Sequence, residues 1–194
     1  MRRVIMEGKV YHIFARGVDK KKVFHDETES KQFLIYLNKA ITKYNLSLFA
    51  FALMGNHFHI LIKGNYVYEA VREVIQSYTG WIHHRHPGQG RVFDYPAHLV
   101  EKQLLKWQID TLLYVLNNPI AAGISKTHYL YKFCSYRFHT KNGSRLKEII
   151  NVDTSLVEQN FKNLQDLKAA LHTKLKYQNL LDDKQTSPTN GMPY

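Results

Sequence analysis

Between residues 10 and 100 the apolar side chains switch repeatedly between two spacings, and this switching limits the folds that the chain can adopt. Apolar residues at steps of three and four predict two helices, one from Asp26 to Tyr44 and one from Val67 to Ile82. Alternating or continuously apolar runs predict strands at residues 10–15, 46–54, 58–63 and 92–100. The elements therefore follow in the order strand, helix, strand, strand, helix, strand.

This order predicts an α+β fold of the ferredoxin-like type (βαββαβ), in which helices cover one face of an antiparallel sheet. The pair Gly55-Asn56 lies between two apolar runs, as in a hairpin. Pro96 restricts the fourth strand to an edge of the sheet or breaks it. Asp26, with Glu29 three residues on, resembles a capping box and predicts the start of the first helix.

Further elements are expected after these two helices. The polar run His83–Arg91 predicts a loop, and a third helix should run from Leu104 to Asn118, because Pro119 cannot continue it. Asp153 is expected to cap a last amphipathic helix. We therefore expect one domain over residues 1–150, a C-terminal amphipathic helix over 151–180 and a disordered tail over 181–194.

The charge distribution favours a polyanionic partner. The formal net charge is +11, and residues 151–194 hold equal numbers of acids and bases, so the whole excess lies in residues 1–150. Nucleic acid is the first candidate partner and an anionic membrane surface the second. The 13 Tyr, 10 Phe and 2 Trp residues could supply surfaces on which unpaired bases stack. A basic surface that serves solubility is the alternative.

Cysteine usage and hydropathy fit a protein of a reducing cytoplasm. Cys134 is the one cysteine, so no disulfide can form within the chain. No apolar run approaches the roughly 20 residues of a transmembrane helix. The first residues lack a sustained apolar core and a small-residue cleavage site, so we expect no signal peptide.

The segment GNHFHILI places two histidines on one face of a strand. Because alternate side chains of a strand share a face, His57 and His59 point the same way, and Phe58 points to the other side. Two neutral imidazoles at this spacing can bind one metal ion. Two solvent-facing histidines with no function are the alternative, so the motif needs a partner elsewhere in the chain.

The segment LLKWQIDTLLYVLNNP supplies a partner for the two histidines. At 100° per residue, an apolar stripe forms on one side of this helix, from Leu105, Ile109, Leu112 and Leu116. Tyr114 and Asn118 lie together on the opposite side. A metal held by His57, His59 and the Asn118 side-chain oxygen would suit Mg²⁺ or Mn²⁺, and the imidazoles favour Mn²⁺. Zinc would also bind such histidines, so the metal stays open.

Together, these segments resemble a known family. GNHFHILI resembles the histidine–hydrophobic–histidine (HUH) motif of single-strand DNA endonucleases. YVLNNPIAAG resembles the tyrosine helix of single-tyrosine transposases, especially the REP-associated tyrosine transposases. HIFARGVDKKKVF resembles their first strand and its Arg-Gly turn, and the similarity runs from about residue 8 to residue 139.

The resemblance implies an activity. Tyr114 would attack a phosphate in single-stranded DNA, leaving a 5′-phosphotyrosine link and a free 3′-hydroxyl that can reverse the step. The metal on His57, His59 and Asn118 would polarise that phosphate. The substrate of such relatives is a short palindromic element folded as a hairpin. The resemblance therefore implies a DNA-cleaving and strand-transferring enzyme on single-stranded or hairpin DNA, acting as a monomer or homodimer away from membranes.

Basic residues are the candidates for phosphate contacts. They are Arg16, Lys20, Lys21, Lys22, Arg85, Arg91, Lys102 and Lys106. For each, a solvated surface charge is the alternative. The run His83–His86 could form another metal cluster, but its expected loop favours a DNA-facing or solvent-facing role. Tyr66 and Tyr68 could stack on bases, Tyr136 lies in a basic segment, and Tyr78 belongs to an apolar stripe.

Two other functions stay open. A non-catalytic nucleic-acid-binding module on the same fold would explain the charge but not the two histidines, Tyr114 and Asn118. A replication initiator or relaxase would share the chemistry, but such proteins usually carry a third histidine or second tyrosine in their motifs. A former transposase retained only for DNA binding is a variant of the first alternative.

Overall fold

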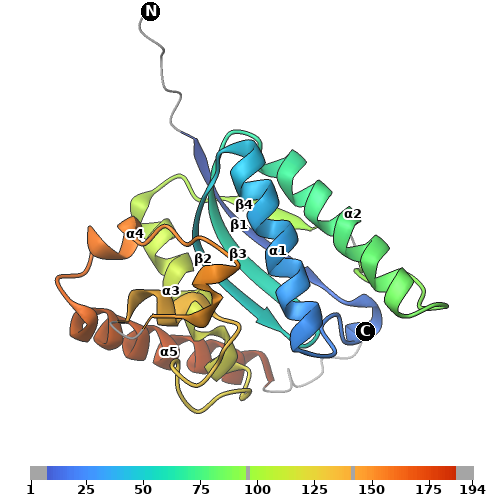
Figure 1. Ribbon diagram of the computed structural model, residues 1–194. Coiled ribbons are helices and arrows are strands. Elements are labelled where there is room, and N and C mark those ends of the chain that lie inside the picture. Colours follow the sequence, from blue (N-terminus) through green and yellow to red (C-terminus); the bar gives the residue numbers. More distant parts are fainter. Residues whose placement is uncertain (1–7, 95–96, 141–142, 187–194) are drawn as a thin grey trace, which may run out of the picture.

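A four-stranded antiparallel sheet forms the centre of the protein. The computed structural model describes residues 8–94, 97–140 and 143–186. The strands are β1 (Lys9–Arg16), β2 (Ser47–Met54), β3 (His57–Gly64) and β4 (His98–Glu101). They lie in the order β2-β3-β1-β4, and each neighbouring pair is antiparallel. With two helices on one face, this confirms the predicted ferredoxin-like α+β fold (Figure 1).

The first face of the sheet carries the two predicted helices, α1 (Glu27–Tyr44) and α2 (Val67–Arg85) (Figure 1). Their apolar stripes pack on the strand residues that point the same way, and Phe33 of α1 contacts Phe58 of β3 with ring centroids 4.9 Å apart. Asp26 caps α1 as predicted, because its Oδ1 accepts a hydrogen bond from the backbone N–H of Glu29. The Glu29 carboxylate completes no capping box, since it accepts from the N–H of His25 instead.

The second face is also covered, by helices that follow the ferredoxin-like unit in the chain. The helices α3 (Leu105–Ala121) and α5 (Leu164–Thr186) lie on the side of the sheet away from α1 and α2 (Figure 1). A second apolar cluster joins Leu61 of β3 to Leu112 of α3 and Leu171 of α5. The physical reason lies in β2, whose residues after Ser47 are all buried, so that both of its faces need cover.

Two helix boundaries differ from the prediction. Helix α2 includes His83 to Arg85, which were expected in a loop. Helix α3 continues past Pro119 to Ala121. Proline removes one N–H donor, and so close to a helix end this costs a single hydrogen bond. The chain after the helix compensates, because the N–H groups of Ala122 and Ile124 donate to the Asn118 and Pro119 carbonyls.

The expected C-terminal helix is two helices. Helix α4 spans only Ser155–Glu158, and α5 begins anew at Leu164, where Asn163 accepts hydrogen bonds from the N–H groups of Gln165 and Asp166. Helix α5 ends at Thr186, inside the expected tail 181–194, whose residues 187–194 lie outside the described part of the chain. Three short 3₁₀ helices complete the fold: η1 (Val18–Lys20), η2 (Ser135–His139) and η3 (Arg145–Glu148).

The fourth strand is shorter than expected. Strand β4 spans His98–Glu101 rather than 92–100, and it forms an edge of the sheet. Phe93 pairs with Gly17 in an isolated bridge, while the expected break at Pro96 lies outside the described residues.

Among residues 8–94, 97–140 and 143–186, no helix is both long enough and apolar enough to span a bilayer.

The loop after β1 is tied to the hairpin turn between β2 and β3. The N–H of Gly17 donates to the carbonyl of Asn56 at 2.8 Å, and the N–H groups of Val23 and Phe24 donate to the carbonyl of Gly55 at 2.8 and 3.0 Å. A Cβ atom on Gly17 would lie 2.2 Å from the carbonyl oxygen of Lys21. The turn therefore requires a residue without a side chain at position 17.

The substitution Gly17→Ala should destabilise the protein by about 1–3 kcal/mol, the usual cost of forcing an extra carbon into a packed site. The comparison is urea-induced unfolding of Gly17→Ala beside Gly80→Ala, which places a Cβ in open space on the exposed side of α2. Gly80→Ala should leave stability unchanged or raise it by up to about 1 kcal/mol, because alanine favours helix. Equal unfolding midpoints for the two variants would contradict the steric explanation.

Candidate functional site

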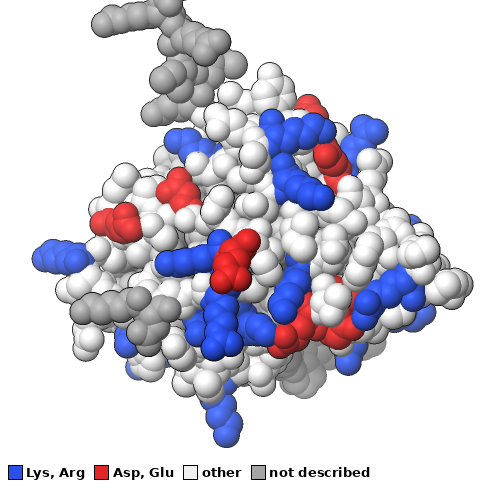
Figure 2. Space-filling view, in the orientation of Figure 1, with Lys and Arg blue, Asp and Glu red and all other residues white. Residues whose placement is uncertain are grey.

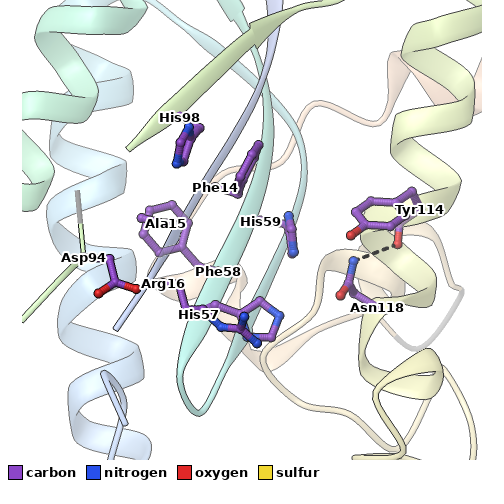
Figure 3. A pocket seen from close by; sticks show the side chains of 10 residues that line it. All are labelled: Phe14, Ala15, Arg16, His57, Phe58, His59, Asp94, His98, Tyr114 and Asn118. Carbon is purple, nitrogen blue, oxygen red and sulfur yellow. Dashed lines mark hydrogen bonds between the residues drawn. The ribbon is translucent and has the colours of Figure 1, made fainter. Parts of the chain in front are cut away.

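Strands β1 and β3 and helix α3 enclose a cavity that brings the predicted site residues together (Figure 3). The cavity has a volume of about 420 Å³. His57 and His59 enter it from β3, and Tyr114 and Asn118 face them from α3 (Figure 3). The remaining lining residues are Phe14, Ala15, Arg16, Phe58, Asp94 and His98.

A chain of hydrogen bonds orients His57. The amide nitrogen of Asn56 donates to the Lys20 carbonyl at 3.2 Å, so the Asn56 side-chain oxygen is the atom that faces His57 Nδ1, at 2.6 Å. That oxygen can only accept, so Nδ1 of His57 carries the proton and Nε2 keeps a free lone pair. Burial lowers the pKa of His57, the charge of Arg16 lowers it further, and a hydrogen bond with Asn118 opposes them.

A third histidine stands directly behind His59. His12 of β1 places its Nε2 3.0 Å from Nδ1 of His59, and the two rings stack with centroids 5.2 Å apart. Burial is the main cause that lowers the pKa of His59 to about 2 and that of His12 to about 4. Both imidazoles are therefore neutral at neutral pH. With the proton of His59 on Nδ1, where His12 can accept it, Nε2 of His59 also keeps a free lone pair.

The sequence analysis missed His12, although part of the signal was there. Strand alternation put His12 on the same face of its strand as Phe14. What links that face to the site is the pairing register, which sets Phe14 opposite His59 and His12 opposite Leu61. His12 is then a diagonal neighbour of His59 on one face of the sheet. A register between strands far apart in sequence cannot be read from either strand alone.

Helix α3 places Tyr114 against the histidines. The Tyr114 ring lies edge-on to His59 and His12, with centroid distances of 5.3 and 5.8 Å. Asn118 is 7% exposed, and its side-chain nitrogen is 3.4 Å from the Tyr114 carbonyl oxygen (Figure 3). The predicted apolar stripe holds for Leu112 and Leu116 but not for Leu105, which is 52% exposed. The opposite side of the helix, expected to be polar, packs towards the sheet.

The donor atoms at the cavity fit a divalent metal ion. His57 and His59 offer neutral imidazole nitrogens, because burial lowers the pKa of each. The Asn118 side chain adds one amide oxygen beside them. Two imidazoles and one neutral oxygen leave further coordination positions for water or a phosphate oxygen, as Mg²⁺ and Mn²⁺ require.

The basic residues proposed for DNA contact fall into two groups. Arg16 lines the cavity, Lys20 to Lys22 are exposed beside it in the loop after β1, and Lys106 is exposed in the first turn of α3. Lys102, at the end of β4, is partly exposed, and Arg91 is exposed in the loop after α2. Arg85 differs, because it forms ion pairs with Asp26 and Glu29, which favours a structural role.

Acidic side chains interrupt the basic ones on the face that Figure 2 shows, so that face is not a uniform basic patch. The other tyrosines are placed as follows. Tyr78 is buried and its hydroxyl donates to the Val23 carbonyl, as expected of a core residue. Tyr136 is buried as well, whereas Tyr66 and Tyr68 are 58% and 63% exposed. None of these four lines the cavity.

Comparison with known proteins finds one matching family model. The model of the family "Transposase IS200 like" matches residues 6–96, a segment that holds His57 and His59 and ends before Tyr114. No curated protein matches the chain.

A solved structure described as a REP-associated tyrosine transposase bound to a REP hairpin has a similar fold. The TM-score is 0.61 and the sequence identity 12%, over 79% of this chain and 92% of that one. The likeness extends well beyond the segment that the family model matches. Over residues 6–96, a little under half of the chain, the sequence is similar to the IS200-like transposases, and the fold is similar to that of the solved REP-associated tyrosine transposase.

Proposed function

We propose that the protein is a metal-dependent single-strand DNA endonuclease and transposase that cleaves and rejoins DNA at hairpin-forming palindromic elements. The observation that carries this proposal is the convergence of His57, His59, Tyr114 and Asn118 on one cavity. The two histidines come from a strand, and the other two residues come from a helix more than 50 residues further along the chain. Their meeting is unexpected for side chains without a shared function.

Tyr114 is the proposed nucleophile. Its phenol oxygen forms a bond to phosphorus as the bond from phosphorus to the 3′-oxygen breaks, which leaves a 5′-phosphotyrosine and a free 3′-hydroxyl. The phenol loses a proton in this step and the departing 3′-oxygen gains one. Because the phosphotyrosine bond replaces a phosphodiester of similar energy, the 3′-hydroxyl of another strand can reverse the reaction and join DNA without ATP.

His57, His59 and Asn118 are the proposed metal ligands. A bound Mg²⁺ or Mn²⁺ would supply Lewis-acid polarisation of the scissile phosphate. The contribution of the chain is orientation: Asn56 holds the proton of His57 on Nδ1, and His12 accepts the proton of His59. Each contact leaves the Nε2 lone pair free for a metal.

The proposed DNA path crosses the mouth of the cavity. Arg16 would contact phosphate inside it, and Lys20, Lys21 and Lys22 would contact the neighbouring backbone. Phe14 and His98 stack on each other with ring centroids 4.8 Å apart and line the same cavity, so they offer an unpaired base an aromatic surface. Hairpin DNA as the substrate rests on the family and on the relative described as bound to a REP hairpin.

Two alternatives have less support. A non-catalytic nucleic-acid-binding module would not explain why two neutral imidazoles, His57 and His59, lie side by side at the cavity. It would also not explain why Tyr114 lies next to them. A replication initiator or relaxase usually carries a third histidine or second tyrosine in its motifs. Among the described residues that line this cavity, Tyr114 is the one tyrosine. The third histidine in the lining, His98, stacks on Phe14, and His12 lies behind His59.

Tyr114→Phe should abolish covalent attachment to DNA, because phenylalanine lacks the attacking oxygen. The test incubates the protein with 5′- and 3′-labelled single-stranded hairpin oligonucleotides from its genomic neighbourhood, with Mn²⁺ or Mg²⁺. A denaturant-stable, metal-dependent adduct is expected for the unchanged chain and is expected to be absent in Tyr114→Phe.

Tyr66→Phe is the matched control, since Tyr66 is exposed and distant from the cavity lining, and it should still form the adduct. An adduct that persists in Tyr114→Phe would assign the nucleophile to another tyrosine. Binding without any adduct, on every hairpin tried, would favour the non-catalytic module.

His12→Ala should weaken Mn²⁺ binding by about 10- to 100-fold, the usual effect of removing a residue that orients a metal ligand. His12→Gln should lose less, because its side-chain oxygen can still accept the proton of His59. Isothermal titration with Mn²⁺ measures both affinities. His98→Ala is the control, since His98 lines the cavity but contacts Phe14 rather than His59. Unchanged affinity in His12→Ala would rule out the orienting role.

Stability should fall as the pH is lowered from about 7 to about 5. The folded pKa values of His12 and His59 lie below their ordinary value of 6.5, so the unfolded chain takes up protons first. Each such histidine then lowers the unfolding free energy by at most about 1.4 kcal/mol per pH unit below 6.5. Urea unfolding at both pH values checks this. The double substitution His12→Asn and His59→Asn should make the difference smaller, and an unchanged difference would refute the assignment.

A further inference from the structure

A second group of ligating side chains lies where α1 begins and α2 ends. It consists of His25, Glu29 and His86, whose ligand atoms all lie within 4.8 Å of one another. His25 Nδ1 is 2.9 Å from Glu29 Oε2, and His86 Nε2 is 2.6 Å from Glu29 Oε1. The ring centroids of the two histidines are 4.9 Å apart. We call these three residues the helix-end cluster.

In the helix-end cluster the carboxylate is buried and the two histidines are partly exposed. The Glu29 side chain is 0% exposed, so its carboxylate is held inside the protein. The side chains of His25 and His86 are 39% and 37% exposed, so the cluster opens to solvent on the histidine side. An ion would therefore enter the cluster from the side of the two histidines.

The charge around the helix-end cluster also favours a cation. Arg85 is shared between two acids, with its Nε 3.2 Å from Glu29 Oε1 and a terminal nitrogen 2.6 Å from Asp26 Oδ2. Glu27, on the same helix, is paired with Lys132. Two carboxylates against one guanidinium leave one negative charge beside two imidazoles. A single divalent ion would offset this negative charge and would leave both histidines neutral.

We propose that His25, Glu29 and His86 bind a divalent transition-metal ion, zinc in particular. Two imidazoles and a carboxylate, with water in the fourth position, form a familiar zinc donor set. Ligand atoms around tetrahedral zinc lie about 3.3 Å apart, so the two nitrogen–oxygen distances here would lengthen by less than about 1 Å. The metal replaces the two ring protons that now point at the carboxylate.

The proposed role is structural rather than catalytic, and it does not depend on the DNA-cleaving activity proposed above. The metal would link the first turn of α1 to the end of α2. His25 directly follows Val23 and Phe24, whose N–H groups donate to Gly55 in the hairpin turn before His57. A zinc ion here would therefore hold the loop after β1 and the helix layer together.

The test uses the tag-free full chain with His57→Ala and His59→Ala, which removes the two histidines proposed as metal ligands in the cavity. Competition with a chromophoric chelator and thermal unfolding with and without zinc are both measured. We expect one zinc per chain and an unfolding temperature that rises by several degrees with zinc. Adding His86→Gln should abolish both effects, because glutamine can still donate a hydrogen bond to Glu29 but is a poor zinc ligand. Adding His84→Gln, an exposed neighbour on the same helix end, should leave both unchanged.

Loss of zinc binding in both the His86→Gln and His84→Gln variants, or in neither, would overturn the proposal. No zinc on the His57→Ala, His59→Ala chain would identify the cluster as a hydrogen-bonded group only. Zinc content is also measured in the chain that keeps His57 and His59. His86→Gln should lower its zinc content by one ion per chain, whether or not the cavity also binds metal, so failure of the cluster and failure of the cavity site are distinguishable.

Discussion

The burial of β2 on both of its faces is the constraint on which the candidate site depends. A strand that is apolar at almost every position cannot leave either side of the sheet in water. Helices α1 and α2 cover one face, and α3 and α5 cover the other (Figure 1). The second cover brings Tyr114 and Asn118 to the two histidines of β3 (Figure 3). The packing of α3 on the sheet therefore both buries the second face and forms the cavity.

The cavity histidines owe their state to that same burial. Withdrawal from water lowers the pKa of His57, His59 and His12, which keeps them neutral where an exposed histidine would begin to take up protons near pH 6.5. Hydrogen bonds then decide which nitrogen carries the proton. Asn56 does this for His57, and for His59 the contact with His12 does so when His12 is the acceptor. The proposed metal ligands are therefore prepared by residues that do not themselves face the metal position.

The loop after β1 connects these arrangements. It supplies the Lys20 carbonyl that fixes the Asn56 amide, and it is itself held by the carbonyls of Gly55 and Asn56. Its far end leads into the helix-end cluster at His25. A zinc ion in that cluster would act on the hairpin turn before His57 through a short run of backbone hydrogen bonds, and would hold it without touching the reacting groups.

The sequence by itself determined whatever depends on local periodicity. Alternation put His57 and His59 on one face, the helical repeat put Tyr114 beside Asn118, and the order of elements predicted the ferredoxin-like fold. Tertiary structure decided what depends on distant segments. The register of β1 against β3 put His12 behind His59, and two-sided burial turned Tyr114 towards the sheet. The approach of two helix ends made a cluster from Glu29 and His86. Such contacts are set by packing between segments far apart in the chain, and no local pattern records them.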